Sequence, residues 1–265
     1  MLLITSELAC RLETAEAVDA AGCAEAQCVL ETNCDAAVQS IAGGVAVFCG
    51  ASSPLTHALG MGMHGPVSAE DMDAVELFFQ SRGAAVVIDV CPHADPTLRD
   101  LASQRGYRIV EFLNVMVRNA DPAELSASAI EVRPAVPEDR ETYVSTVIGG
   151  FFGRQPLTPE EAALGTTLFH MPCTTAYLAW IDGQPAGGGG MSIRNRIASF
   201  FGDATLPAYR GKGVHSATIR ARIADAMNAG CELMTAGTTP GSASQRNYER
   251  LGFHVAYTKP TMVLE

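Results

Sequence analysis

Two basic side chains and two glycines lie close together where a strand gives way to a long helix. Residues 209–215 read Tyr-Arg-Gly-Lys-Gly-Val-His, and Pro207 breaks the strand before them. The glycines let the backbone curl, and the first turn of the helix leaves its N–H groups without partners. Such a turn binds anionic phosphate through those donors and the positive end of the helix dipole. Arg210 and Lys212 add positive charge there, so the segment predicts a phosphate-binding loop.

The spacing of this loop separates it from the common nucleotide loops. The chain lacks Gly-x-x-x-x-Gly-Lys-Ser/Thr, which argues against a P-loop NTPase. Its own order, Arg-x-x-Gly-x-His over residues 210–215, resembles the Arg/Gln-x-x-Gly-x-Gly/Ala pyrophosphate loop of the GNAT superfamily, the acyl-CoA-dependent N-acyltransferases. His215 departs from that pattern, because a small residue is usual there. Its ring could crowd the pyrophosphate or add a donor to it.

A second motif follows about thirty residues later. A short apolar strand is followed by a turn and by a helix that Ser242 caps and Gly252 ends. In GNAT enzymes a helix ending in Tyr-x-x-x-Gly-Phe follows the fifth strand, and its tyrosine points at the sulfur of acetyl-CoA. The resemblance gives that place to Tyr248. It makes Ser244 and Asn247 cofactor contacts on the same helix.

The resemblance implies transfer of an acetyl group from acetyl-CoA, as co-substrate, to a primary amine of a small-molecule acceptor. Tyr248 is the expected general acid for the departing thiolate. Asp203 is the first candidate for the general base, with a water relay and His170 as alternatives. Backbone N–H groups near Thr205 and Leu206 are expected to hold the pantetheine arm and polarise the carbonyl. The expected cofactor-binding residues are Thr205, Leu206, Arg210, Gly211, Lys212, Gly213, Val214, His215, Ser244 and Asn247.

The order of elements in residues 129–265 fits this resemblance. Thr158 and Pro159 predict a helix start, as N-cap and first helical residue. Apolar patterns predict strands over 174–181, 184–193 and 197–206, with Asp182-Gly183 as a hairpin turn, and a helix over 213–229.

The first half of the chain repeats the second half without its chemistry. Residues 82–91 align with 229–237, and 102–110 align with 248–256 at nearly the same offset. The repeat predicts an α/β chain of two tandem GNAT-like domains, 1–122 and 129–265, each with a mixed, mostly antiparallel sheet flanked by helices. Tandem arrangements are known in the superfamily.

The chemistry of the second half has no counterpart in the first. Glu70 and Asp71 stand at the helix start where a pyrophosphate would be repelled, and Ala102 takes the place of Tyr248. We therefore expect CoA to bind only the second domain. The first domain is expected to serve either as a lid or wall of the acceptor pocket or as a structural partner that buries an exposed face.

The composition of the chain argues against two classes of partner, nucleic acid and membrane. The 265 residues carry a net charge of −11 without a basic stripe, which disfavours nucleic acid. No apolar run is long enough to cross a membrane, and the N-terminus does not read as a signal peptide, so we expect a cytoplasmic protein. The eight cysteines form no Cys-x-x-Cys and are expected to be reduced packing residues. The sequence does not indicate the oligomeric state.

Other patterns in the chain have more than one reading. Gly60-x-Gly62-x-x-Gly65 has the form of a dinucleotide loop, but a strand-to-helix connection is favoured because the Ser68 cap starts the helix too late. The four glycines 187–190 interrupt a strand and predict room either for substrate or for a neighbouring helix. The side chains that could be assembled into a metal site have no ligand spacing, so no metal is expected; they are His57, His64, Cys91 and His93.

The remaining alternatives concern aromatic residues and function. Phe151, Phe152 and Phe169 lie in the helices that usually wall the acceptor site, and predict either an apolar pocket or core packing. The alternative to an enzyme is a non-catalytic acyl-CoA-binding or regulatory protein.

Overall fold

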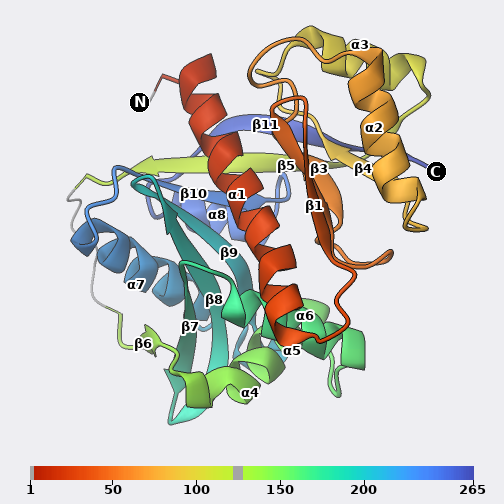
Figure 1. Ribbon diagram of the computed structural model, residues 1–265. Coiled ribbons are helices and arrows are strands. Elements are labelled where there is room, and N and C mark those ends of the chain that lie inside the picture. The colour runs from red at the N-terminus through yellow and green to blue at the C-terminus, as the bar shows by residue number, and fades with distance from the viewer. Residues whose placement is uncertain (1–2, 122–127) are drawn as a thin grey trace. The chain divides into compact units, whose positions relative to one another are not determined.

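The chain folds into two compact units. The structure, a computed structural model, describes residues 3–121 and 128–265. Unit 1 consists of Met1–Val115 with Ala256–Glu265, and unit 2 of Met116–Val255. Both strands at the boundary, β5 (Arg108–Asn119) and β11 (His254–Leu264), therefore have residues in both units (Figure 1).

The expected domain boundary needs a correction at the C-terminus. The sequence assigned residues 256–265 to the second domain, but they belong to unit 1. The physical reason is strand pairing: β11 runs antiparallel to β4 (Val86–Asp89), with Met262 opposite Ile88. Met262 also lies in the hydrophobic core of unit 1. A strand that is last in the chain thus completes the first unit.

Unit 1 is a mixed sheet with helices packed on it. The antiparallel strands β1, β2 and β3 come first, and β3 then pairs in parallel with β4. Its other elements are α1 (Ser6–Leu30), β1 (Ala37–Ile41), β2 (Gly44–Phe48), β3 (His57–Leu59), α2 (Ala69–Gln80) and α3 (Pro96–Gln104).

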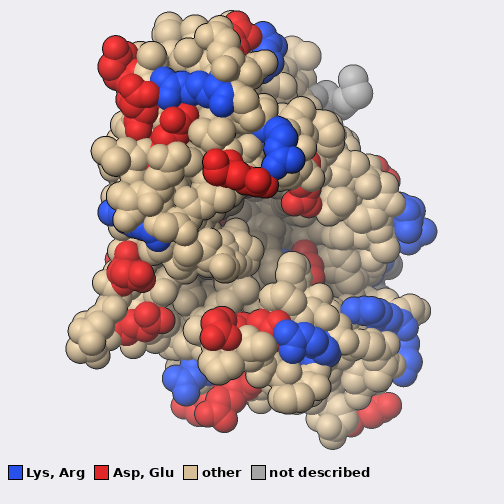
Figure 2. All heavy atoms as spheres, turned by 90° about the vertical axis from the view of Figure 1, so that its right-hand side faces the viewer, with Lys and Arg blue, Asp and Glu red and all other residues tan. Residues whose placement is uncertain are grey.

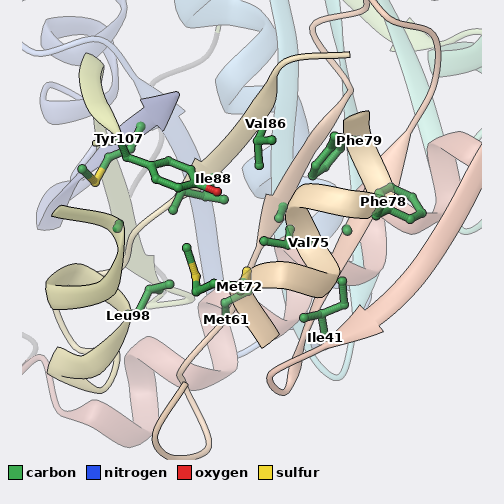
Figure 3. Close-up of a cluster of buried hydrophobic side chains, with 14 of the residues drawn as sticks. Ile41, Met61, Met72, Val75, Phe78, Phe79, Val86, Ile88, Leu98 and Tyr107 are labelled. Atoms are coloured by element: carbon green, nitrogen blue, oxygen red, sulfur yellow. The ribbon is translucent and has the colours of Figure 1, made fainter. Parts of the chain in front are cut away.

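The core of unit 1 is built from α2, α3 and the sheet. Figure 3 shows Met72, Val75 and Phe79 of α2 turned toward Ile88 of β4, with Leu98 of α3 beside them. These five side chains are at most 1% exposed. Apolar spacing of three and four residues along α2 places its buried side chains on one face, which is why this short helix docks on the sheet.

The glycine pattern at 60–65 forms a connection, as expected. Gly60 and Gly62 adopt positive φ angles of 69° and 72° in a turn, and α2 begins only at Ala69. Ser68 caps that helix in a capping box with Asp71. The acidic residue at the helix start is thus bound to the cap, and the glycines do not lie at a helix N-terminus.

The cysteines correct one expectation. Cys28, in the last turn of α1, forms a disulfide with Cys34 in the following loop. The expectation of eight reduced thiols is therefore wrong for this pair, which closes a short loop that sequence spacing alone did not mark. The other six cysteines carry thiols.

A buried ion pair joins α1 to the last strand. Lys259 of β11 is 0% exposed, and its Nζ lies 3.2 Å from both carboxylate oxygens of Glu13 and 2.6 Å from Glu16. Burial alone would lower the pKa of Lys259, but the charges of Glu16 and Glu13 outweigh it and raise that pKa. Tyr257 donates a further hydrogen bond of 2.8 Å to Glu13. This cluster fixes where β11 sits against α1.

Unit 2 carries the longer antiparallel strands. β6 to β9 form a meander, and β9 pairs in parallel with β10. Its strands are β6 (Glu131–Pro134), β7 (Thr174–Ile181), β8 (Gln184–Arg194), β9 (Ile197–Thr205) and β10 (Leu233–Thr238), and its α-helices are α4 (Arg140–Tyr143), α5 (Gly149–Phe152), α6 (Pro159–His170), α7 (Val214–Asn228) and α8 (Ala243–Glu249). The three strands expected from the pattern and the long helix after them are confirmed to within one or two residues.

Local signals placed the ends of these elements correctly. Thr158 caps α6 with Glu161 in a capping box, and Pro159 occupies its first turn. Asp182 and Gly183 have positive φ angles of 53° and 72° and turn β7 into β8. Ser242 caps α8 by accepting from the N–H of Gln245.

The surface shows no broad patch of one charge on the face seen in Figure 2, where acidic and basic side chains are interspersed among uncharged ones. Among the described residues, no helix is long and apolar enough to cross a membrane.

We predict that Lys259→Ala destabilises the protein by about 3–5 kcal/mol, because it leaves the buried carboxylate of Glu13 without a counter-charge. Urea denaturation followed by circular dichroism measures the loss. The control is Arg108→Ala, which breaks the exposed pair of 2.6 Å between β5 and Glu265, the residue after β11. That change should cost about 0–1 kcal/mol. Equal effects of the two substitutions would contradict the role assigned to the buried pair.

Candidate functional site

The predicted phosphate loop lies at the start of α7. Gly211 and Gly213 have φ angles of 77° and 86°, a region that side chains disfavour, and Gly213 is the N-cap of the helix. Arg210 donates hydrogen bonds of 3.4 Å to the carbonyl of Thr205 and 3.1 Å to that of Gly150. Arg210 therefore fixes the loop to the end of β9 and to α5, while its neighbour Lys212 stays exposed.

A wedge opens beside this loop because two parallel strands separate. β9 and β10 pair from Ile197 with Leu233 as far as Phe200 with Ala236. β9 then continues to Thr205 without that partner. A bulge in the pairing of β8 with β9, between Gly188 and Gly190, falls at the same place, so β9 turns away where the pairing with β10 ends.

A pocket of about 510 Å³ occupies the wedge. It brings together nine of the twelve expected site residues, from the end of β9, the loop, α7 and α8. The lining residues are Asp203, Ala204, Thr205, Tyr209, Arg210, Gly211, Gly213, Val214, His215, Ser216, Ala243, Ser244, Asn247 and Arg250. Leu206, Lys212 and Tyr248 belong to neighbouring positions outside that lining.

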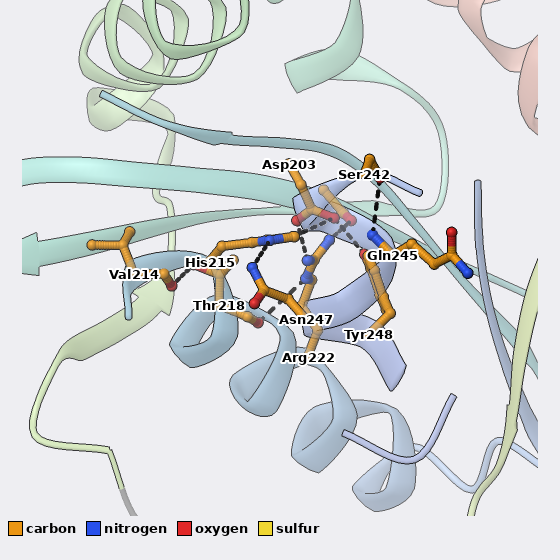
Figure 4. A network of polar contacts seen from close by, with 10 residues as sticks. Asp203, Val214, His215, Thr218, Arg222, Ser242, Gln245, Asn247 and Tyr248 are labelled. Carbon is orange, nitrogen blue, oxygen red and sulfur yellow. Dashed lines mark hydrogen bonds and ion pairs between the residues drawn. The ribbon is translucent and has the colours of Figure 1, made fainter. Parts of the chain in front are cut away.

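Asp203 is the centre of a polar network at the wall of the pocket (Figure 4). One carboxylate oxygen accepts from the guanidinium of Arg222, and the other accepts from the hydroxyl of Tyr248. Nε2 of His215 lies 3.4 Å from that second oxygen. Three side chains from two helices thus converge on one carboxylate of β9.

These contacts keep Asp203 ionised. Burial alone would raise the pKa of Asp203, but Arg222, and after it His215 and Tyr248, outweigh burial and lower the pKa to about 2. A carboxylate with so low a pKa takes up a proton poorly. The network therefore argues against Asp203 as the general base and favours a role in holding Arg222 and Tyr248.

Arg222 is a member of this network that sequence analysis missed. Its side chain is 0% exposed, donates 2.8 Å to the carbonyl of Gly190 and 3.3 Å to that of Thr218, and stacks on Phe200 with 4.6 Å from Cζ to the ring centre. It falls on the apolar face of α7 between Ile219 and Ile223. A basic residue among these apolar positions was the available signal, since a buried charge requires a partner.

Tyr248 is fully buried and has its hydroxyl bonded to Asp203. Burial, and then the negative charge of Asp203, raises the pKa of Tyr248 well above its usual value, while Arg222 opposes the rise. The hydroxyl is therefore protonated at neutral pH. Its ring packs edge-on against Phe253, with centroids 4.9 Å apart.

His215 lies between the pocket and the buried tyrosine. Its ring meets that of Tyr248 edge-on at 5.6 Å, and Nδ1 lies 3.0 Å from Nδ2 of Asn247. Because an amide nitrogen can only donate, Nδ1 accepts and the ring proton is on Nε2, toward Asp203. Arg250 donates to the amide oxygen of Asn247 at 3.3 Å, which supports this orientation of the amide.

The glycine run in β8 makes room for protein side chains. A Cβ on Gly189 would lie 2.7 Å from Oδ1 of Asp203 and 3.0 Å from Arg222. A Cβ on Gly187 would lie 2.5 Å from the carbonyl of Ala204. The run is thus needed for the network and the neighbouring strand, which explains it without a substrate.

The backbone donors at the end of β9 differ from expectation. The N–H of Leu206 donates 3.0 Å to the carbonyl of Ala186, so this expected donor is already used within the sheet. The ladder between β8 and β9 is interrupted at Gly202 and Asp203, and such a bulge leaves backbone groups outside the regular pairing. Gly202 adopts a φ angle of 65° there.

Tyr143 of α4 approaches this bulge from another helix. Its hydroxyl is buried and has no hydrogen-bond partner among the described residues. A Cβ on Gly202 would lie 3.8 Å from that hydroxyl. Burial raises the pKa of Tyr143 above its usual value. Sequence analysis did not mark this tyrosine, because nothing near it in the chain indicates its neighbours.

The other residues singled out by sequence lie apart from this network. Phe151 and Phe152 are 65% and 40% exposed and pack edge-on against each other, while Phe169 packs against Tyr143. His170 ends α6 beside Phe169. Within residues 3–121 and 128–265, no group of three or more His, Cys, Asp or Glu side chains could hold a metal ion.

Comparison with known proteins agrees with this geometry. Residues 146–253 match the model of the Acetyltransferase (GNAT) family, so the chain carries a GNAT acetyltransferase domain over that segment. A search of curated proteins found no match.

Solved structures show the same fold at low sequence identity. A GCN5-related N-acetyltransferase from Kribbella flavida is 16% identical, with a TM-score of 0.65 over 92% of this chain and 95% of that chain. One from Sphaerobacter thermophilus is 20% identical, with 0.57 over 74% and 67%. A tandem GNAT protein from the clavulanic acid biosynthesis pathway is 13% identical, with 0.54 over 73% and 68%. The expected GNAT-like α/β fold is thereby confirmed.

We predict that Asp203→Asn lowers the stability of unit 2 at neutral pH by about 3–5 kcal/mol, because Arg222 stays buried without a counter-charge. The only tryptophan, Trp180, lies in unit 2 and reports its unfolding in urea by fluorescence. A depressed carboxyl pKa contributes stability above the ordinary value and loses it as pH falls through the folded value. The gap between variant and wild type should therefore shrink between the ordinary pKa of 3.8 and about 2.

The matched control is Asp225→Asn on the same helix as Arg222. Asp225 accepts 2.8 Å from the hydroxyl of Tyr177. Losing the charge on that acceptor should cost about 1–2 kcal/mol. An Asp203→Asn variant as stable as wild type at pH 7 would show that the carboxylate does not balance Arg222.

Proposed function

We propose that the chain is an N-acetyltransferase that moves an acetyl group from acetyl-CoA to a primary amine of a small-molecule acceptor. The observation that carries the proposal is the pocket at the N-terminus of α7, which combines a glycine-rich basic loop with the wedge between β9 and α8. Membership of residues 146–253 in the GNAT acetyltransferase family supports acyl transfer in general. The proposed location is the cytoplasm.

The proposed cofactor position follows from the chemistry of the lining. The pyrophosphate binds the N–H groups of residues 211–215, where the helix dipole favours negative charge. Arg210 and Lys212 add charge-assisted contacts. The pantetheine arm enters the wedge past Thr205 on one side and Ser244 and Asn247 on the other.

In the proposed mechanism a neutral amine attacks the thioester carbonyl. Backbone N–H groups at the bulge of β9 polarise the carbonyl oxygen of the thioester. Tyr248 protonates the departing thiolate. The tyrosinate that remains is stabilised by Arg222, whose positive charge already opposes the rise in the pKa of Tyr248. Asp203 orients both groups, and the amine proton leaves through water, since the low pKa of Asp203 makes it a weak base.

A second candidate function is binding of acyl-CoA without catalysis. Two observations favour it: Tyr248 is buried with its hydroxyl already bonded to Asp203, and the bulky His215 stands where a small residue is usual in the family. Tight CoA binding together with no thiol release across a panel of primary amines would support this candidate over the enzyme.

We predict that Lys212→Glu weakens CoA binding by roughly 10- to 100-fold, because a charge-assisted contact becomes a repulsion. Arg210→Glu with Lys212→Glu should weaken it further. Isothermal titration calorimetry on the full chain measures the dissociation constant. The control Arg140→Glu reverses an exposed charge of α4 outside the pocket and should leave the constant unchanged. If Lys212→Glu and Arg140→Glu bind CoA with the same dissociation constant, the loop does not hold the pyrophosphate.

We predict that Tyr248→Phe lowers kcat by about 10²–10⁴-fold and leaves acetyl-CoA affinity nearly unchanged, because only the proton donor is removed. Release of free CoA thiol in the presence of an accepted amine gives the rate. The control is Tyr177→Phe, which removes another buried hydroxyl bonded to a carboxylate, Asp225, away from the pocket. A Tyr248→Phe variant with normal kcat would leave that ring a packing role. Joint loss of binding and turnover would indicate damage to the fold.

A further inference from the structure

His215 spans the wedge between its two walls. Nε2 lies 3.4 Å from Asp203 on β9, and Nδ1 lies 3.0 Å from Asn247 on α8. All three residues line the pocket. Figure 4 shows the ring pointing away from the start of α7 into the space between these two partners. The ring thus blocks the wedge between Asp203 and Asn247.

The buried part of the network lies beyond this ring. Tyr248 and Arg222 are both fully buried and do not line the pocket. The edge-on contact of 5.6 Å puts the His215 ring directly against the Tyr248 ring. A chain that starts at the phosphate loop and runs to the Tyr248 hydroxyl must therefore pass the position that His215 occupies.

We propose that His215 is a gate residue that keeps the thioester arm of acyl-CoA away from the Tyr248 hydroxyl until its ring leaves the position between Asp203 and Asn247. This inference rests on the proposed CoA site. It assigns to His215 the control of access to the reacting groups. It also implies that the nucleotide end and the pantetheine arm of CoA contribute separately to the free energy of binding. The nucleotide end binds at the loop without moving His215, while the arm must displace it.

The partners of His215 make displacement costly but feasible. The bond from Asn247 is a single hydrogen bond between neutral groups, and the approach to Asp203 is long at 3.4 Å. A hydrogen bond of this kind contributes modestly because water replaces it. The side chain is 16% exposed and lines the pocket, so the ring has open space on that side.

Two ligands distinguish the contribution of the nucleotide end of CoA from that of its arm. Adenosine 3′,5′-bisphosphate carries the nucleotide end without the arm, and CoA carries both. Calorimetry on the full chain gives each dissociation constant for wild type, His215→Ala and His215→Gln. The ratio of the bisphosphate constant to the CoA constant measures what the arm contributes.

In His215→Ala we expect this ratio to rise by roughly 3- to 10-fold, because the arm no longer breaks the contacts of His215. The bisphosphate constant should change less than the CoA constant does. His215→Gln keeps a polar side chain that can both donate and accept, so the ratio should rise less. Arg220→Ala, on α7 outside the pocket, is the control and should leave the ratio unchanged. Thermal melting verifies that each variant is folded.

Three results would overturn the gate. An unchanged ratio in His215→Ala shows that the ring does not obstruct the arm. A lower ratio shows that His215 holds the arm as a contact. Failure of wild type to bind either ligand removes the proposed CoA site itself, and the gate with it. Binding of both ligands with an unchanged ratio, by contrast, leaves the cofactor proposal standing and sinks the gate alone.

Discussion

The buried ion pair of Asp203 with Arg222 is the interaction on which the site of unit 2 depends. A guanidinium with 0% exposure is tolerated only because a carboxylate and two carbonyls satisfy it. Its position requires glycine at 189, where any Cβ would meet both partners. It also ties β9 to α7 directly beside the bulge. The strand departs from β10 at that point, so the pair holds open the wedge that forms the pocket.

The same pair defines what the neighbouring groups can do. Because Arg222 and its companions lower the pKa of Asp203 to about 2, the carboxylate serves as a fixed acceptor. It orients the hydroxyl of Tyr248 and attracts His215 from the pocket side. Guanidinium, phenol and imidazole side chains thus share one anion. Asp203, the first candidate for the general base in the sequence, is here a fixed carboxylate that holds the Tyr248 hydroxyl and lies beside His215.

Unit 1 depends on a second buried pair of the same kind. Lys259 comes from the last strand and Glu13 from the first long helix, 246 residues apart in the chain. Both side chains are buried, so the carboxylate of Glu13 needs the charge of Lys259, and Lys259 needs the charges of Glu13 and Glu16. The last strand is therefore bound to the first helix, while the predicted phosphate loop and the pocket belong to unit 2.

The sequence by itself determined the features that depend on near neighbours in the chain. Caps at Thr158 and Ser242, the turn at Asp182 and Gly183, and the loop before α7 arise from hydrogen bonds and backbone preferences within a few residues. Alternating apolar residues placed β7, β8 and β9 for the same reason. The GNAT resemblance also rested on such local motifs.

Only the tertiary structure decided which distant side chains meet. Tyr248 and Asp203 are 45 residues apart, and Arg222 lies among the apolar residues of α7, so no spacing rule connects the three. The pairing of β11 with β4 and the use of the Leu206 N–H by Ala186 likewise follow from how strands lie side by side. Such contacts form only after burial has removed water from both partners, and their energies depend on that burial more than on sequence distance.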